Sequence, residues 1–268
     1  MLPTLKDILD TLDEIAPFIL AEEWDNSGLQ VGSLSHEIKK IYVALDPTIE
    51  TLKNASNTGA QLLLTHHPLI YKPLLNINYE KYPGEIIYFA SKAEISIIAA
   101  HTNLDICIGG INDILANILN LEGIKALEEH NGNSESIGIG RIGTLQKPLE
   151  LSKVIEILKN CLGVNNIMVS GKNDKIIKRI AVVGGSGGDT ISTAAQKGAD
   201  LLVTGDIKYH QAMEAQNSGL SLIDGGHFHT ERTALKVFSG IFKDALASKG
   251  WDVMLEFHGN EKNPMRFV

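Results

Sequence analysis

Two neighbouring histidines, His66 and His67, end an apolar run in the segment LLLTHHPL. Successive side chains of a strand point to opposite faces of a sheet, so both imidazoles can serve one site only if the strand ends before them. Pro68 favours that ending, because proline cannot continue a central ladder and forces the residue before it out of the helical region. We expect both rings to turn toward one pocket. The alternative is a polar turn after a buried strand.

Further imidazoles and carboxylates follow other apolar runs. The segment HTNLD (101–105) follows the run ISIIAA, and His227 and Glu231 stand four residues apart in GHFHTER. If a helix begins near His227, this spacing puts both side chains on one helix face. Such groups at strand ends form a ligand set for divalent transition metals. The candidate metal ligands are His66, His67, Asp105, His227 and Glu231.

Five ligands exceed the four that a tetrahedral ion needs, and two ions that share a bridging carboxylate fit the set better. Mixed imidazole and carboxylate ligands suit zinc, iron, manganese, nickel or cobalt, so the identity of the metal stays open. His101 either orients a metal ligand or shuttles protons, and Asp206 is a second candidate for proton relay.

The other histidines are not expected to bind metal. His229 follows His227 by two residues and so points to another helix face. Ordinary surface or core positions are expected for His36, His130 and His258. Candidates for the rim of a substrate pocket, or else helix caps or packing residues, are Trp24, Asp25, Asn26 and His210.

Short apolar runs rich in isoleucine and valine alternate with helical patterns along the chain. The expected helices cover residues 49–58, 82–93 and 111–119, and the N-terminal segment 1–18 has the spacing of an amphipathic helix. This alternation predicts an α/β fold with a substantial parallel sheet.

The alternating pattern contains an internal repeat. Residues 41–65 and 180–204 align without a gap and share the pairs Gly59-Ala60 and Gly198-Ala199. We interpret the repeat as a duplicated half-domain, although any two strand–helix–strand units resemble each other. The polar, glycine-rich stretch near residues 128–136 predicts a first lobe over 1–128 and a second over 129–268, whose C-terminal part could pack back on the first.

Composition narrows the functional class. With 24 basic against 32 acidic residues, the net charge of −8 argues against a surface built mainly for nucleic acid. Cys107 and Cys161 are too few for a disulfide framework, which suits a reducing compartment. No run approaches the roughly 20 apolar residues of a membrane span. We expect a cytoplasmic protein that does not bind membranes.

Five motifs resemble those of the Nif-three-like family, whose bacterial members are often labelled type 2 GTP cyclohydrolase I homologues. In chain order they are WDNSGLQVG (24–32), THHPL (65–69), HTNLD (101–105), GADLLVTGD (198–206) and GHFHTER (226–232). The resemblance covers nearly the whole chain and implies two related, interlinked α/β lobes. It further implies a dinuclear metal site in the cleft, on the same five ligands, and a homohexameric ring. The short connection between the lobes matches the compact form of the family, without its inserted domain.

These expectations favour metal-dependent hydrolysis of a nucleotide-like or other small substrate. Two ions about 3.5–4 Å apart would lower the pKa of a bridging water toward neutrality. One candidate reaction is ring opening of GTP, in which water adds at the imidazole carbon of guanine and formate leaves. The alternatives are a metal-dependent phosphoesterase and a non-catalytic metal-binding ring or interaction scaffold. The glycine-rich segment 182–190 is either a phosphate cradle or a tight strand-to-helix turn.

Overall fold

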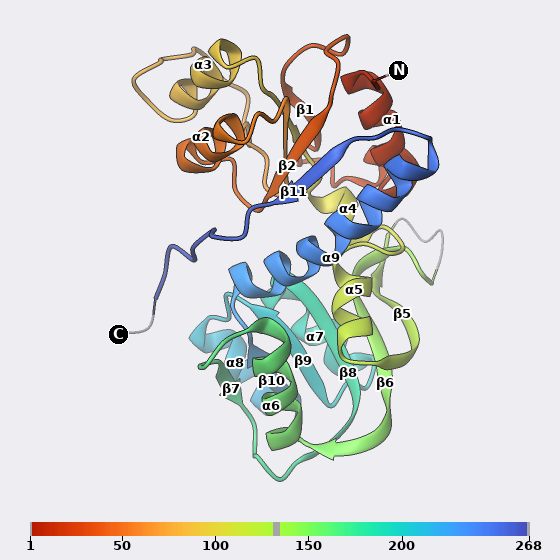
Figure 1. The fold of residues 1–268 in the computed structure, drawn as a ribbon. Coiled ribbons are helices and arrows are strands. Elements are labelled where there is room, and N and C mark those ends of the chain that lie inside the picture. The colour runs from red at the N-terminus through yellow and green to blue at the C-terminus, as the bar shows by residue number, and fades with distance from the viewer. Residues whose placement is uncertain (1, 131–134, 267–268) are drawn as a thin grey trace. The chain divides into compact units, whose positions relative to one another are not determined.

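The computed structural model describes residues 2–130 and 135–266, which fold into two compact α/β units (Figure 1). The first unit runs to Leu104 and includes Leu235–Lys262, and the second covers Asp105–Ala234 with the residues from Asn263 onward. The chain therefore divides at residue 104 and not near residue 128. The reason is that the strand ending at Glu129 pairs within the second sheet, while the C-terminal strand joins the first.

The first unit contains a five-stranded sheet in the order β1-β4-β3-β2-β11, in which only β1 runs antiparallel to its neighbour. Every residue of β3 and β4 is buried, as expected for central strands covered on both faces. The strands are β1 (Gly28–Val31), β2 (Lys40–Ala44), β3 (Leu62–Thr65), β4 (Ser96–Ala99) and β11 (Met254–Phe257). The helical elements between residues 2 and 106 are α1 (Leu5–Ile15), η1 (Phe18–Leu20), α2 (Ile49–Asn57), α3 (Gly84–Lys92) and α4 (Thr102–Ile106).

The second unit contains a mixed six-stranded sheet in the order β5-β6-β8-β9-β10-β7, with a parallel centre formed by β8, β9 and β10. Its strands are β5 (Leu121–Glu129), β6 (Gly138–Glu150), β7 (Met168–Ser170), β8 (Ile176–Ser186), β9 (Leu201–Gly205) and β10 (Ser221–Asp224). Its helical elements are α5 (Ile111–Ile118), α6 (Leu151–Leu162), η2 (Gly188–Thr190), α7 (Ile191–Gln196) and α8 (Tyr209–Asn217). The boundaries between the units fall inside α4 after Leu104, inside α9 (His227–Ser248) after Ala234, and between Lys262 and Asn263.

The internal repeat has the same local structure in both units. Ile41 pairs with Leu62 in parallel register, and Ile180 pairs with Leu201 at the equivalent positions. The helix of each repeat ends before a glycine with a positive φ, +75° at Gly59 and +71° at Gly198. Glycine is favoured there because other residues are strained in the left-handed region. The alignment therefore locates equivalent strand ends in the two units.

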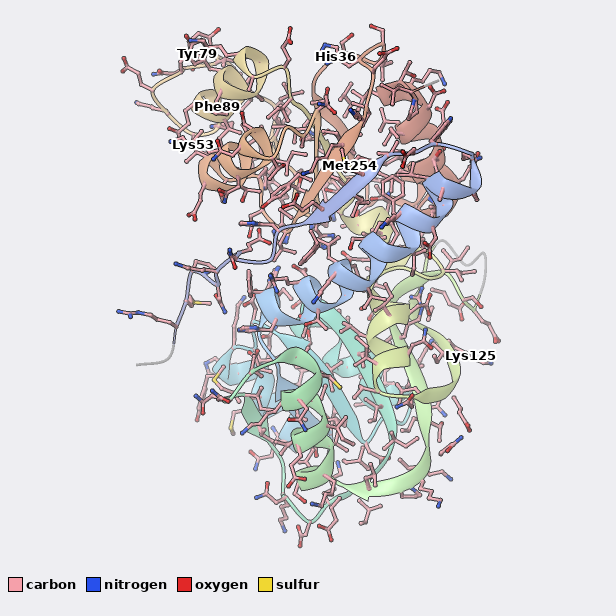
Figure 2. All side chains as sticks on the ribbon, in the orientation of Figure 1. His36, Lys53, Tyr79, Phe89, Lys125 and Met254 are labelled. Carbon is pink, nitrogen blue, oxygen red and sulfur yellow. The ribbon has the colours of Figure 1, made fainter. Side chains whose placement is uncertain are left out.

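The predicted helices match those of the structure to within two residues at most ends. In α1 the expected amphipathic pattern buries Leu5, Ile8 and Leu12, and Thr4 caps its first turn by accepting from the Asp7 amide. Among the described residues, no helix combines the length and the apolar character that a membrane crossing requires. His36 lies at the rim of the first unit, away from the sheet centre (Figure 2).

Candidate metal centre

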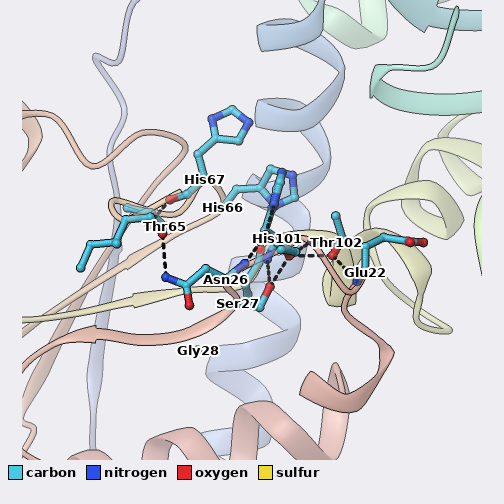
Figure 3. Close-up of polar contacts among 12 residues, drawn as sticks. Glu22, Asn26, Ser27, Gly28, Thr65, His66, His67, His101 and Thr102 are labelled. Atoms are coloured by element: carbon cyan, nitrogen blue, oxygen red, sulfur yellow. Dashed lines mark hydrogen bonds and ion pairs between the residues drawn. The ribbon is translucent and has the colours of Figure 1, made fainter. Parts of the chain in front are cut away.

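Three histidines gather at the carboxyl edge of the first sheet. Strand β3 ends at Thr65, immediately before His66 and His67, and the neighbouring parallel strand β4 ends just before His101. One ligand atom from each imidazole lies within 4.8 Å of the others, and the three rings converge in Figure 3. Ligands of open α/β sheets bind outside this edge. The prediction that both rings of the histidine pair turn toward one place is confirmed.

Hydrogen bonds determine which nitrogen of each ring carries the proton. Nδ1 of the fully buried His66 lies 2.8 Å from the carbonyl oxygen of Ala100, which can only accept, so this nitrogen carries the proton. Nδ1 of His67 donates to Oδ1 of Asp46 over 2.8 Å. In the neutral imidazole Nε2 then keeps its lone pair, as in histidines that bind metal ions.

Asp25 holds the third histidine. Its buried carboxylate accepts from Nδ1 of His101 at 2.8 Å, from the Thr102 hydroxyl at 2.6 Å and from the Ser27 hydroxyl at 2.8 Å (Figure 3 shows the surrounding residues). Burial alone raises the pKa of Asp25, but the hydrogen bonds from His101, Thr102 and Ser27 together lower that pKa well below its usual range. Asp25 therefore stays ionised and keeps the proton of His101 on Nδ1.

Asp46 is itself held from the C-terminal segment of the first unit. The carboxylate of Glu261 accepts from the backbone amides of Leu45, at 2.9 Å, and Asp46, at 2.9 Å. These contacts fix the backbone at the carboxyl end of β2, from which Asp46 reaches His67. A residue far along the chain thus supports the orientation of a histidine at the cluster.

The second unit brings His227 and Glu231 together at the start of α9. The helix begins at His227, which meets the condition for both side chains to share a helix face, and Nε2 of His227 lies 3.0 Å from Oε2 of Glu231, which is only 4% exposed. Nδ1 of His227 donates to Oδ2 of Asp206 over 2.7 Å, in the turn that follows β9. This pair repeats the carboxylate–histidine arrangement of the first unit.

The glycine-rich segment leaves space for Glu231. A Cβ built on Gly185, whose φ is +64°, would lie 2.1 Å from Oε1 of Glu231 and 3.3 Å from Nε2 of His227. A Cβ on Gly205 would lie 2.4 Å from the His227 amide nitrogen. Neither interpretation of residues 182–190 included this close packing, in which the glycines let two strands approach the beginning of α9.

Asp105 lies on α4, one turn after His101 and at the start of the second unit. The Asn112 side chain donates to the Asp105 carbonyl at 3.0 Å. Buried Arg141 donates to the next two carbonyls, those of Ile106 at 3.2 Å and Cys107 at 2.8 Å, and forms a two-pronged pair with Asp113. The backbone around this candidate ligand is therefore tied down by buried polar contacts.

The remaining histidines lie in other surroundings. His258 is buried and its Nδ1 lies 2.7 Å from the Tyr42 hydroxyl in the first unit. Nε2 of His229 lies 3.3 Å from the Asn263 side chain, and burial, with the nearby Arg232, lowers the pKa of His229. His210 lies on α8 and lines a surface groove between α7 and α8. His130 follows β5.

Reasoning from the sequence missed the groups that orient the histidines. Asp46 was not singled out, although it follows β2 at the same sheet edge as His66 and His67. Asp25 was considered only as a rim, capping or packing residue, and Gly185 only as part of a phosphate cradle or a tight turn. His101 belongs to the cluster itself. The signal for Asp46 was available, because a carboxylate directly after a predicted parallel strand lies at the edge where ligands bind.

Comparisons with known proteins agree over the full length. The family model described as Duf34/NIF3 (NGG1p interacting factor 3) matches residues 3–264. A Clostridium perfringens protein named GTP cyclohydrolase 1 type 2 homolog is 38% identical and covers 98% of this chain and 99% of its own. A Helicobacter pylori protein named GTP cyclohydrolase 1 type 2 is 37% identical, with coverage of 98% and 99%.

Two solved structures share the fold. The Bacillus cereus protein related to NIF3 superposes with a TM-score of 0.93 at 27% identity and covers 100% of both chains. Reduced HcgD from Methanocaldococcus jannaschii superposes with a TM-score of 0.82 at 33% identity and covers 97% of this chain and 99% of its own.

Proposed function

The chain belongs to the Duf34/NIF3 family, and we propose that it is a metal-dependent hydrolase of a small, nucleotide-like substrate. The observation that carries the proposal is the set of hydrogen bonds at Nδ1 of His66, His67, His101 and His227, each to a carbonyl or carboxylate oxygen. Packing alone does not explain why Nδ1 of all four histidines is hydrogen-bonded to an oxygen acceptor. The arrangement is the one that supports metal-ligating imidazoles.

We further propose that the candidate ligands hold two divalent ions per chain. These are His66, His67, Asp105, His227 and Glu231. The donor set fits a transition metal, because Nδ1 of each imidazole lies on an acceptor oxygen, which places the lone pair of the neutral ring on Nε2, and because Gly185 leaves space for the Glu231 carboxylate. When bound, two such ions would lower the pKa of a water molecule and polarise a substrate oxygen.

His101 and Asp206 are our candidates for proton transfer. Asp25 holds the proton of His101 on Nδ1, so Nε2 is the basic nitrogen that would accept a proton at the cluster. Asp206 is partly exposed and accepts from Nδ1 of His227, which would let it exchange protons with solvent. GTP is the first substrate to test, because relatives carry the name GTP cyclohydrolase 1 type 2.

The deciding experiment measures metal content and turnover on the same preparation. The protein is purified without a His tag or added metal, and elemental analysis is combined with an assay for formate release from GTP. We expect about two metal equivalents per chain, the number that bridged two-ion sites hold. The double variant His66→Ala, His67→Ala and the variant Glu231→Ala should lose metal, while His36→Ala, at the rim of the first unit, should not.

Two outcomes would refute parts of the proposal. GTP turnover that is unchanged in the double histidine variant would exclude the histidine cluster from the reaction. Metal binding without turnover of GTP or of a panel of phosphate esters would favour a non-catalytic metal-binding ring or scaffold.

We also propose a ring of six chains, which the family resemblance implies and which would have six times the 29.1 kDa of one chain in light scattering. We also propose a cytoplasmic location, which cell fractionation would test.

A further inference from the structure

We propose that Trp24 and Tyr71 form a stacking platform for a planar nitrogen heteroaromatic ring of the substrate. The platform lies beside His101 in the first unit, and it names the substrate class of the site described above. This inference rests on the proposed function, because it assumes that a small molecule occupies the histidine cluster.

The two rings are large, exposed and close to the cluster. Trp24 is 56% exposed and Tyr71 is 52% exposed, and their ring centroids lie 5.9 Å apart at an interplanar angle of 56°. The Trp24 and His101 ring centroids lie 6.0 Å apart, with the rings edge to face. A ligand ring that stacks on Trp24 is therefore within reach of the cluster that holds His101.

The backbone beneath these exposed rings is held rigidly. Asp25, the residue after Trp24, is anchored by the hydrogen bonds from His101, Thr102 and Ser27. The hydrogen bonds of Asp25, which also hold His101, limit the movement of the backbone that carries the Trp24 indole. Such ordering before a ligand arrives lowers the entropic cost of binding, which suits a binding residue.

Tyr71 is tied to the same segment through the residue before it. The Asn26 side chain donates to the carbonyl oxygen of Ile70 at 2.6 Å, and the amide of Ile70 donates to Oε1 of Gln30 at 3.1 Å. Gln30 in turn donates to the Asn26 carbonyl at 2.7 Å. These contacts lock the chain on both sides of the platform, so the relative placement of the two rings does not depend on a ligand.

The aromatic character of the two side chains indicates the class of ligand. Exposed aromatic side chains stack well on nucleobases and other planar heterocycles, and stacking does not require a particular pattern of hydrogen bonds. An unsubstituted polyphosphate offers no such face. Loss of one stacking partner weakens binding of a base by on the order of 10-fold or more.

The two tryptophans of the chain, Trp24 and Trp251, allow a direct test. In the variant Trp251→Phe, fluorescence reports on Trp24 alone, and titration with GTP, adenosine or flavin mononucleotide should quench it. Inorganic tripolyphosphate should not. The matched variant Trp24→Phe retains only Trp251, so the same ligands should not quench its tryptophan fluorescence. The phenylalanine ring at position 24 still provides a face for stacking.

Affinity separates stacking from a structural role. Equilibrium dialysis of the quenching ligand should show a Kd raised on the order of 10-fold in Trp24→Leu and in Tyr71→Leu, and close to that of the unchanged protein in Trp24→Phe. The metal content of all three variants should be unchanged. Failure of the proposed function would appear instead as absent metal, or as absent turnover in the unchanged protein.

Three results would overturn the platform. The first is the absence of quenching by every heteroaromatic probe, and the second is an unchanged Kd in Trp24→Leu. The third is a Trp24 emission that shifts with protein concentration alone, which would show that a second copy of the chain covers these rings.

Discussion

Replacing Gly185 by alanine is expected to displace the Glu231 carboxylate and to weaken metal binding while the fold survives. The new Cβ would lie 2.1 Å from Oε1 and 3.0 Å from Cδ of Glu231, whereas ordinary contacts begin near 3.4 Å. Oε1 is the end of a flexible side chain, so the carboxylate can move away at little cost to folding. That movement removes it from the position next to Nε2 of His227.

The size of both effects follows from this geometry. Relief of the clash requires a movement of about 1 Å, and ligand positions in metal sites tolerate only about ±0.2 Å. We expect metal affinity to fall by about 10–100-fold, the range measured when ligand support is disturbed. The φ of +64° adds a destabilisation of about 1–2 kcal/mol, because alanine is strained in the left-handed region.

Gly198→Ala is the matched control. Gly198 lies in the same unit with a φ of +71°, but a Cβ there would meet nothing within 4 Å. Its cost in stability should equal that of Gly185→Ala, and its metal affinity should equal that of the unchanged protein. Competition with a chromophoric chelator gives the affinity, and urea unfolding of the metal-free protein gives the stability. Equal metal affinities in the two variants would refute the argument.

Three further changes test the supports around the site. Asp46→Asn should lower metal affinity by about 10–100-fold, since a weaker acceptor then faces Nδ1 of His67, and an unchanged chelator titration would contradict this role. Arg141→Met should reduce the free energy of unfolding by about 3–5 kcal/mol, because it leaves a carboxylate and buried carbonyls without their donor. Urea unfolding should show almost no effect for the exposed control Arg179→Met. Burial raises the pKa of Cys107 to about 12, so mass spectrometry after brief alkylation of the native protein at pH 8 should find the partly buried Cys161 modified first. Faster modification of Cys107 would contradict the burial of its thiol.

Much of the local structure could be predicted from periodicity. The end of β3 before His66 followed from Pro68, and the shared helix face of His227 and Glu231 followed from their spacing once a helix begins near His227. The gapless repeat even anticipated the equivalent parallel registers in the two sheets. These features were accessible because each depends on residues within about one turn or one strand of each other.

The division of the chain was not accessible in this way. A polar, glycine-rich stretch near residue 128 suggested a boundary, but β5, which ends at Glu129, and β6, which begins at Gly138, pair with each other in the same sheet. Strand β11 pairs with β2, more than 200 residues earlier in the chain. Pairing partners depend on which edges are left open when the sheets assemble, and the local sequence of either strand does not encode this.

The sequence by itself determined the residue types of the site and the strand ends that carry them, because alternating and helical spacing dictate local direction. Only the tertiary structure decided which nitrogen of each histidine carries the proton. Asp25 meets His101 across 76 positions, and Asp46 meets His67 across 21. The requirement for glycine at position 185 also comes from the tertiary structure, because a Cβ there would clash with Glu231, on a helix that begins 42 positions later. Contacts of this kind exist only after distant segments have packed, so their physical cause lies in the fold and not in any one motif.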